Sequence, residues 1–214
     1  MGEHENKQQK TQLPAKNIVV MSANRYWLQG IATINKSHLT ADVNVIYCHT
    51  LTMLRHHMLH SDIAGVVTTL CGDGETIIDW LGFREWCFRH KLSTGIILVN
   101  KFGFYKTGII TDIAAEIVSP ALPVSQMAAL LSALANQQYH FNTSTCGETG
   151  CHHLTRREMD FFTRLSQGDT VERLASQLSI SRKTVGVYKY NVLQKLGIRR
   201  MALFYRICNA QTVN

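Results

Sequence analysis

The sequence of 214 residues lacks several features that would assign it to common classes of protein. No apolar run approaches the roughly 18 residues of a membrane span, and the start, Met1–Asn6, has no signal-peptide pattern. The six cysteines are scattered, which predicts reduced thiols rather than a disulfide framework. There is no Walker loop, no Gly-x-Ser-x-Gly elbow and no pair of catalytic carboxylates in a glycine-rich frame. We therefore expect a cytoplasmic protein without a membrane contact, an enzymatic activity, a cofactor or a resident metal.

Positive charge is concentrated in the last third of the chain. Residues 1–150 hold 11 basic and 11 acidic side chains, whereas residues 151–214 hold 11 basic and 4 acidic ones. The second part therefore carries the whole formal net charge of +7. A neutral body with a basic terminal domain is typical of proteins that bind nucleic acid. The length also suits two small domains better than one large one.

Short apolar runs alternate with helical stretches between residues 16 and 138. The predicted strands are 18–21, 43–47, 63–67, 95–99 and 115–118; the predicted helices lie around 27–34, 51–59, 76–90 and 124–137. This alternation favours a parallel sheet that is covered by helices on both faces. The polar residues 1–15 predict a disordered start, and residues 139–151 have the composition of a linker.

The most specific pattern lies between residues 154 and 200. Thr155 and Glu158 have the spacing of a capping box at the start of a helix, and Gly168 suits a left-handed helix end. A second, short helix follows, and Ser181 is placed to cap a third. This order and spacing resemble the DNA-binding domain of LuxR/FixJ-type bacterial transcription regulators.

The resemblance implies a helix-turn-helix domain over residues 152–210 that binds double-stranded promoter DNA. The third helix, from about Arg182 to Leu196, would be the recognition helix. The apolar side chains that recur at helical spacing should face the core: Val185, Tyr188, Val192 and Leu196.

Positions matching Gly186, Val187 and Tyr190 touch base edges in the family. None of these three residues can recognise guanine through two hydrogen bonds, so we expect modest sequence specificity. The rest of the expected DNA-binding surface supplies phosphate contacts or lies on the same face: Arg182, Lys183, Thr184, Lys189, Gln194, Lys195, Arg199 and Arg200.

A final amphipathic helix follows Gly197. In the family this helix forms the dimer contact between DNA-binding domains, which points to Met201 and Phe204 here. Packing of the same helix on its own domain is the alternative.

The first domain resembles the receiver domain of two-component response regulators but lacks the residues for aspartyl phosphorylation. Ser22–Asn24 replaces the acidic pair that would hold Mg²⁺, Thr68–Cys71 replaces the acceptor, and Ser119-Pro120 replaces the lysine and proline. Asp73 lies close to the expected acceptor position, but a single aspartate in a loop is more typical of a turn. We therefore predict that this domain does not work by phosphotransfer.

The expected architecture is an α/β doubly wound, degenerate receiver-like domain (16–138) followed by an all-α LuxR-type helix-turn-helix domain. Among such proteins, the resemblance is to enteric auxiliary regulators of acid resistance, capsule and curli. It implies a regulator that acts as a homodimer, or as a heterodimer with a response regulator.

Two other functions remain as alternatives. A related branch binds cyclic di-GMP through a four-residue motif from Trp to Arg, but Trp80–Arg84 is one residue too long and fits helical core packing better. The second alternative is a protein-interaction module that sequesters a true regulator and hardly touches DNA.

Two groups of histidines and cysteines carry weaker hypotheses. A short segment could present ligands to Zn²⁺ through Cys146, Cys151, His152 and His153, although structural zinc sites usually join two separate segments. His56 and His60 share a helical face and could sense pH. Plain linker residues and a plain helix surface are the preferred interpretations of the two groups.

Overall fold

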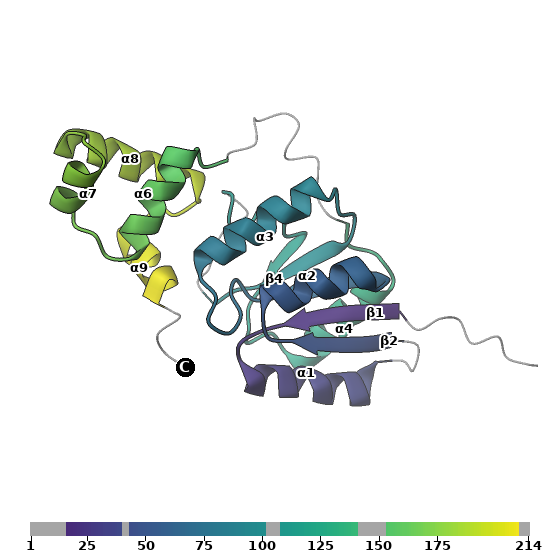
Figure 1. Cartoon of the computed structure of the whole chain (residues 1–214). Helices are drawn as coiled ribbons and strands as arrows, with labels where there is room; N and C mark the ends of the chain where they lie inside the picture. Colours follow the sequence, from purple (N-terminus) through teal and green to yellow (C-terminus); the bar gives the residue numbers. More distant parts are fainter. Residues whose placement is uncertain (1–15, 40–42, 102–107, 141–152, 210–214) are drawn as a thin grey trace, which may run out of the picture.

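The first domain is a parallel five-stranded sheet between two layers of helices (Figure 1). The computed structural model describes residues 16–39, 43–101, 108–140 and 153–209. The strands are β1 (Lys16–Met21), β2 (Val43–Cys48), β3 (Ile63–Thr68), β4 (Gly95–Val99) and β5 (Glu116–Val118). All neighbours pair in parallel, in the order β2-β1-β3-β4-β5. This confirms the predicted doubly wound α/β fold.

Alternating side chains of the central strands fill two separate cores. Ile18 and Val20 of β1 point to the face covered by α1 (Arg25–His38) and α4 (Val124–Ala135). Val19 and Met21 point to the opposite face, covered by α2 (Leu51–His60) and α3 (Ile77–Arg89). Burial on both faces explains why the strands are apolar without alternation in the sequence.

The connection from β4 to β5 differs from the other connections of the sheet. The first three crossovers each contain a helix, whereas the described part of this one, residues 108–115, consists of turns. Its apolar side chains are nevertheless buried, in a cluster that continues into the C-terminal domain: Ile109, Ile110 and Ile113. The two domains therefore pack against each other at this connection.

The described part of the C-terminal domain, residues 153–209, contains four helices. These are α6 (Arg156–Ser166), α7 (Val171–Gln177), α8 (Arg182–Lys195) and α9 (Met201–Asn209). The bounds confirm the three helices expected between residues 154 and 200 and the final amphipathic helix. The expected disordered start and most of the expected linker lie outside the described residues. Within the described part of the chain, no helix is both long and apolar enough to cross a bilayer.

Candidate nucleic-acid interface

The start of α6 has the predicted capping box, which is also linked to the end of α8. The Thr155 hydroxyl accepts a hydrogen bond from the backbone N–H of Glu158 at 3.2 Å, and the Glu158 carboxylate accepts one from Thr155 N–H at 2.8 Å. The same carboxylate pairs with the ammonium group of Lys195 at 2.7 Å. Burial opposes ionisation of Glu158, but the bonds from Lys195 and Thr155 outweigh it, so its pKa lies below the ordinary value.

The end of α6 and the start of α8 follow from local sequence. Gly168 has a φ of +89° after α6, which is the left-handed conformation predicted for it. The Ser181 hydroxyl accepts the backbone N–H of Thr184 at 3.0 Å and so caps α8 as predicted. Such a cap contributes about 1 kcal/mol. It fixes where α8 begins, and therefore which side chains occupy its two faces.

The inner face of α8 packs on α6 and α7. Val185, Val192 and Leu196 are buried, and the ring of Tyr188 lies 5.8 Å from the ring of Phe161. All four residues expected to face the core therefore do so. Phe161, which the sequence pattern did not single out, is fully buried in the same core.

The outer face of α8 is open to solvent. Val187 and Tyr190 are 52% and 62% exposed. Gly186, which precedes Val187, is also exposed and has no side chain. The side-chain amide of Gln194 donates a hydrogen bond of 2.6 Å to the Tyr190 hydroxyl, one turn away, and restrains this ring. The expected base-reading residues therefore share one accessible surface.

The basic residues expected to hold phosphates differ in availability. Arg182 and Lys183 are exposed at the start of α8, and Arg199 and Arg200 are exposed beyond its end. The nearest acid to Arg182 is Glu172 at 3.9 Å, a solvent-screened pair.

The other expected phosphate contacts are more constrained. Lys189 is half-buried on α8. The Thr184 hydroxyl lies 2.8 Å from the Ser181 hydroxyl. The Lys195 ammonium group donates hydrogen bonds to Glu158 and to the backbone carbonyl of His153, and its side chain is 28% exposed.

The two expected dimer residues on α9, Met201 and Phe204, differ in burial. Phe204 is fully buried and packs edge-on against Phe162, with ring centroids 5.9 Å apart. It therefore belongs to the core of its own domain, because the amphipathic face of α9 covers α6. Met201 is half-buried, and the exposed aromatic side chain of α9 is Tyr205, at 47%.

The carboxyl edge of the sheet holds no acidic cluster among the described residues. Thr68 ends β3 and is buried, with its hydroxyl donating to the carbonyl of Thr69. The carboxylate of Glu75 instead accepts backbone N–H groups of Leu51 and Gly72, at 2.7 and 2.9 Å, and so occupies the N-terminus of α2. Asp73 is a surface residue, 4.0 Å from Arg25.

The structure describes the histidines of the pH-sensing hypothesis but only part of the segment proposed to bind zinc. Cys146, Cys151 and His152 lie outside the described residues, and no cluster of three metal-binding side chains occurs in the described part of the chain. His56 and His60 are both exposed, with ring centroids 4.5 Å apart.

The Trp80–Arg84 motif is occupied by contacts within the protein. The indole N–H of Trp80 donates to the carbonyl of Ile110 at 2.8 Å, and Arg84 is only 1% exposed. Its guanidinium group forms a bidentate pair with Asp112. Neither side chain is free to bind a nucleotide in this conformation.

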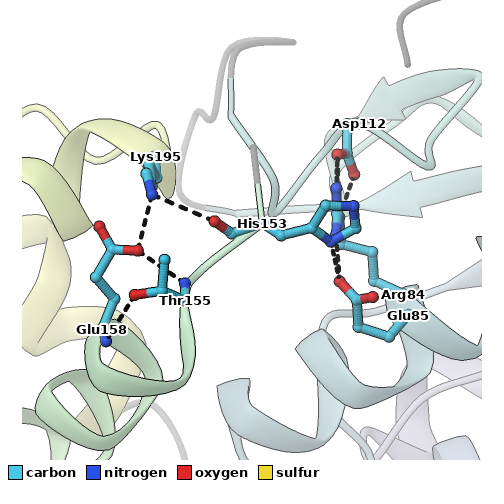
Figure 2. Close-up of polar contacts among 7 residues, drawn as sticks. All are labelled: Arg84, Glu85, Asp112, His153, Thr155, Glu158 and Lys195. Atoms are coloured by element: carbon cyan, nitrogen blue, oxygen red, sulfur yellow. Dashed lines mark hydrogen bonds and ion pairs between the residues drawn. The ribbon is translucent and has the colours of Figure 1, made fainter. Parts of the chain in front are cut away.

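Contacts between the domains were not indicated by the sequence. No local pattern marks Glu85 or Asp112, and His153 is marked only as a possible zinc ligand. The three meet because α3, the β4–β5 connection and the start of the C-terminal domain converge (Figure 2).

Comparison with known proteins matches the C-terminal domain at the level of sequence. Residues 152–207 match the family described as bacterial regulatory proteins of the luxR family. The response regulator UvrY of Escherichia coli (strain K12) is 31% identical over 67 residues, which cover 28% of this chain and 31% of that protein. The spore germination protein GerE of Bacillus subtilis (strain 168) is 46% identical over 46 residues, covering 22% of this chain and 62% of that protein. The matched segment thus spans less than two thirds of these relatives.

Solved structures match over most of the chain. RcsB from Salmonella enterica serovar Typhimurium, bound to the flhDC P1 promoter with the phosphomimetic BeF3−, has a TM-score of 0.57 and 20% identity. That match covers 93% of this chain and 99% of the other. A structure of two RcsB dimers on two parallel DNAs has a TM-score of 0.52 and 19% identity, covering 94% and 100%. At this identity, the likeness establishes a shared fold: a receiver-like α/β domain followed by a LuxR-type domain.

Proposed function

We propose that this protein, whose C-terminal domain is a LuxR-type helix-turn-helix domain, is a bacterial transcription regulator that binds promoter DNA through α8. The observation that carries the proposal is the exposed outer face of α8. Val187 and Tyr190 offer apolar contact to a thymine methyl group and one hydroxyl hydrogen bond. Arg182, Lys183 and Arg199 surround them with positive charge suited to phosphates.

The proposed regulator works without aspartyl phosphorylation. Thr68 at the end of β3 offers no carboxylate to accept a phosphoryl group, and Ser22 and Asn24 after β1 offer no acidic pair for Mg²⁺. Glu75 already fills the N-terminus of α2, a place that would otherwise favour an anion. Input to this domain would therefore come from a partner protein or a small ligand rather than from a phosphoryl group.

Dimerisation, either with itself or with an intact response regulator, would supply the specificity that α8 lacks. The structurally similar RcsB has been captured as dimers on DNA, which supports a two-fold arrangement here. None of the three expected base-reading residues, Gly186, Val187 and Tyr190, has a side chain for bidentate guanine recognition. A second subunit would double the number of bases that are read.

Selection of genomic fragments by the purified protein, followed by a salt titration, tests the proposal. Lys183→Ala removes an exposed phosphate contact, and Lys36→Ala on α1 is a matched control far from α8. We expect wild type and Lys36→Ala to select the same fragments, with a steeper salt dependence than Lys183→Ala. No retention of DNA by the wild-type protein at low salt, with or without a partner, would refute the proposal.

A further inference from the structure

The outer face of α2 carries three histidines at helical spacing. His56 and His60 lie one turn apart and are both exposed, with ring centroids 4.5 Å apart and ring planes tilted by 51°. His57 is half-buried, and its ring centroid lies 5.9 Å from that of His56. Among the described residues, neither exposed ring has a hydrogen bond or an ion pair with another side chain. The nitrogens of both rings are therefore available to an external ligand.

The separation of the two exposed rings suits coordination of a single metal ion. A histidine nitrogen that binds Zn²⁺ lies about 2.0–2.1 Å from the ion. If the ion lies in line with each ring, at an angle between the square-planar and the tetrahedral value, the ring centroids are about 4.5–5.2 Å apart. The observed 4.5 Å lies at the lower end of this range. Small rotations of two exposed side chains are therefore enough to direct one nitrogen of each ring at a common ion.

The charges on α2 are compatible with a cation at this place. His57 and His60 belong to the last turn of the helix, where unpaired backbone carbonyls form its negative end. The one permanent cation of α2 is Arg55, whose guanidinium carbon lies 5.8 Å from the ring centroid of Phe83 and 5.9 Å from that of Trp86, both on α3. Its charge is therefore directed to the side of α2 that packs on α3, and not to the outer face.

The donor atoms of this face determine which ions it can hold. Imidazole suits zinc, copper and nickel, whereas calcium and magnesium require oxygen ligands. Met53, one turn before His56 and His57, is 43% exposed and adds a thioether sulfur, a donor that favours copper(I). The described part of the chain has no cluster of three histidine, cysteine or acidic side chains placed to share an ion, so water would fill the other coordination positions.

We propose that His56 and His60 form a two-histidine site for a late first-row transition-metal ion on the outer face of α2. Structural zinc sites hold four protein ligands, so an ion with two is bound reversibly and keeps open positions. The site belongs to the first domain and shares no residue with the DNA-reading face of α8. The inference therefore goes beyond the proposed function and does not depend on it.

Titration of the full chain with Ni²⁺, followed by two-dimensional NMR, tests the site. Ni²⁺ accepts imidazole ligands and, unlike Cu²⁺, does not oxidise the cysteines. Because it is paramagnetic, it broadens the amide signals of residues close to it, so that each binding site in the chain is located separately. We expect broadening centred on residues 56–60. Any binding by the segment with Cys146, Cys151, His152 and His153 would broaden a different set of amides.

Single substitutions show whether the two histidines act together. His56→Gln and His60→Gln each remove one ligand and keep a neutral polar side chain. His38→Gln, at the exposed end of α1, is the matched control because it removes a surface histidine elsewhere in the same domain. Loss of a partner outside the ligand set costs about 10-fold to 100-fold in metal affinity, so loss of a ligand should weaken binding at α2 at least about tenfold. His38→Gln should match wild type.

The outcomes separate a built site from scattered surface binding. Broadening at α2 that is weakened in both His56→Gln and His60→Gln, and abolished when the two are combined, supports the proposal. Broadening that persists in the combined variant, equal weakening in His38→Gln, or broadening that needs a large excess of Ni²⁺ over protein would overturn it. The unaffected signals of each spectrum show that the variant is folded. A failure of the wild-type protein to bind DNA would refute the proposed function and leave the metal result unchanged.

Discussion

Substitution of Glu158 by glutamine should loosen the whole C-terminal domain, although the change is nearly isosteric. Glu158 is 8% exposed and links the start of α6 to the end of α8. Glutamine can still accept the backbone N–H of Thr155 through its amide oxygen. What is lost is the charge that faces the ammonium group of Lys195.

The structure sets the size of this loss. A hydrogen bond between charged groups contributes about 1.5–3 kcal/mol, and exposed pairs contribute far less. The side chains of Glu158 and Lys195 are 10% and 28% exposed, which places the pair nearer the buried case. We therefore expect Glu158→Gln to lower the free energy of unfolding of this domain by about 1–2 kcal/mol.

Hydrogen exchange of α6 and α8 amides is the appropriate assay. The three tryptophans, Trp27, Trp80 and Trp86, all belong to the first domain, so tryptophan fluorescence does not report the second one directly. A loss of 1–2 kcal/mol should accelerate exchange about five- to thirtyfold in the helices that open with the domain.

A double-mutant cycle with Lys195→Met isolates the pair, and Glu172→Gln, at an exposed carboxylate, is the control. The reasoning is refuted if Glu158→Gln accelerates exchange no more than Glu172→Gln, or if the coupling between Glu158 and Lys195 is close to zero. Lys195 would then be available to phosphates, as the sequence alone suggests.

The pH dependence has a definite sign. The pKa of Glu158 is lowered in the folded protein, so the unfolded chain binds the proton more tightly. The stabilisation is therefore complete above the unfolded pKa of about 4.3 and is lost as the pH falls through the lower folded value. Glu158→Gln should remove this part of the acid sensitivity and leave stability near pH 7 reduced but flatter with pH.

Three further substitutions test other parts of the structure. Tyr190→Phe removes one hydroxyl, and we expect a changed base preference at one position worth about 1 kcal/mol with little change in total affinity, measured by site selection; equal losses on all DNA would contradict this. Lys183→Ala should reduce the slope of log K against log salt by about 1, whereas Lys195→Ala should leave it nearly unchanged because Glu158 already holds that ammonium group; equal slopes for both variants would show that Lys195 contacts phosphate. Phe204→Ala should destabilise the C-terminal domain by about 3–5 kcal/mol by opening a cavity, whereas Tyr205→Ala should leave stability unchanged and weaken any self-association through α9, measured by sedimentation; the reverse pattern would restore Phe204 as a dimer contact.

Local patterns were sufficient to predict the elements and much of the C-terminal domain. Each of the five predicted strands occurs within two residues of its expected bounds, because burial on both faces leaves an apolar run with clear ends. The capping box at Thr155 and the caps at Gly168 and Ser181 involve residues within three or four positions of one another. The exposed side of α8 follows from helical spacing once its start is fixed.

Local patterns left the contact undecided where a side chain had more than one candidate partner. The sequence pattern of α9 cannot distinguish a dimer contact from a core contact, and the structure buries Phe204 against Phe162. Lysine in the last turn of a DNA-binding helix suggests phosphate contact, yet Lys195 pairs with a residue 37 positions earlier. Neither outcome could be read from spacing, because both depend on how α6, α8 and α9 pack.

The sequence by itself determined the two fold classes, the basic C-terminal domain and the residues displayed on α8, because these depend on charge, periodicity and caps within a few residues. Only the tertiary structure decided how the domains meet. The contact joins α3, a connection without a helix in its described part and the end of α8, through residues such as Arg84, Gly108 and His153. Such contacts are set by the three-dimensional packing of distant segments, for which a single sequence holds no periodic signal.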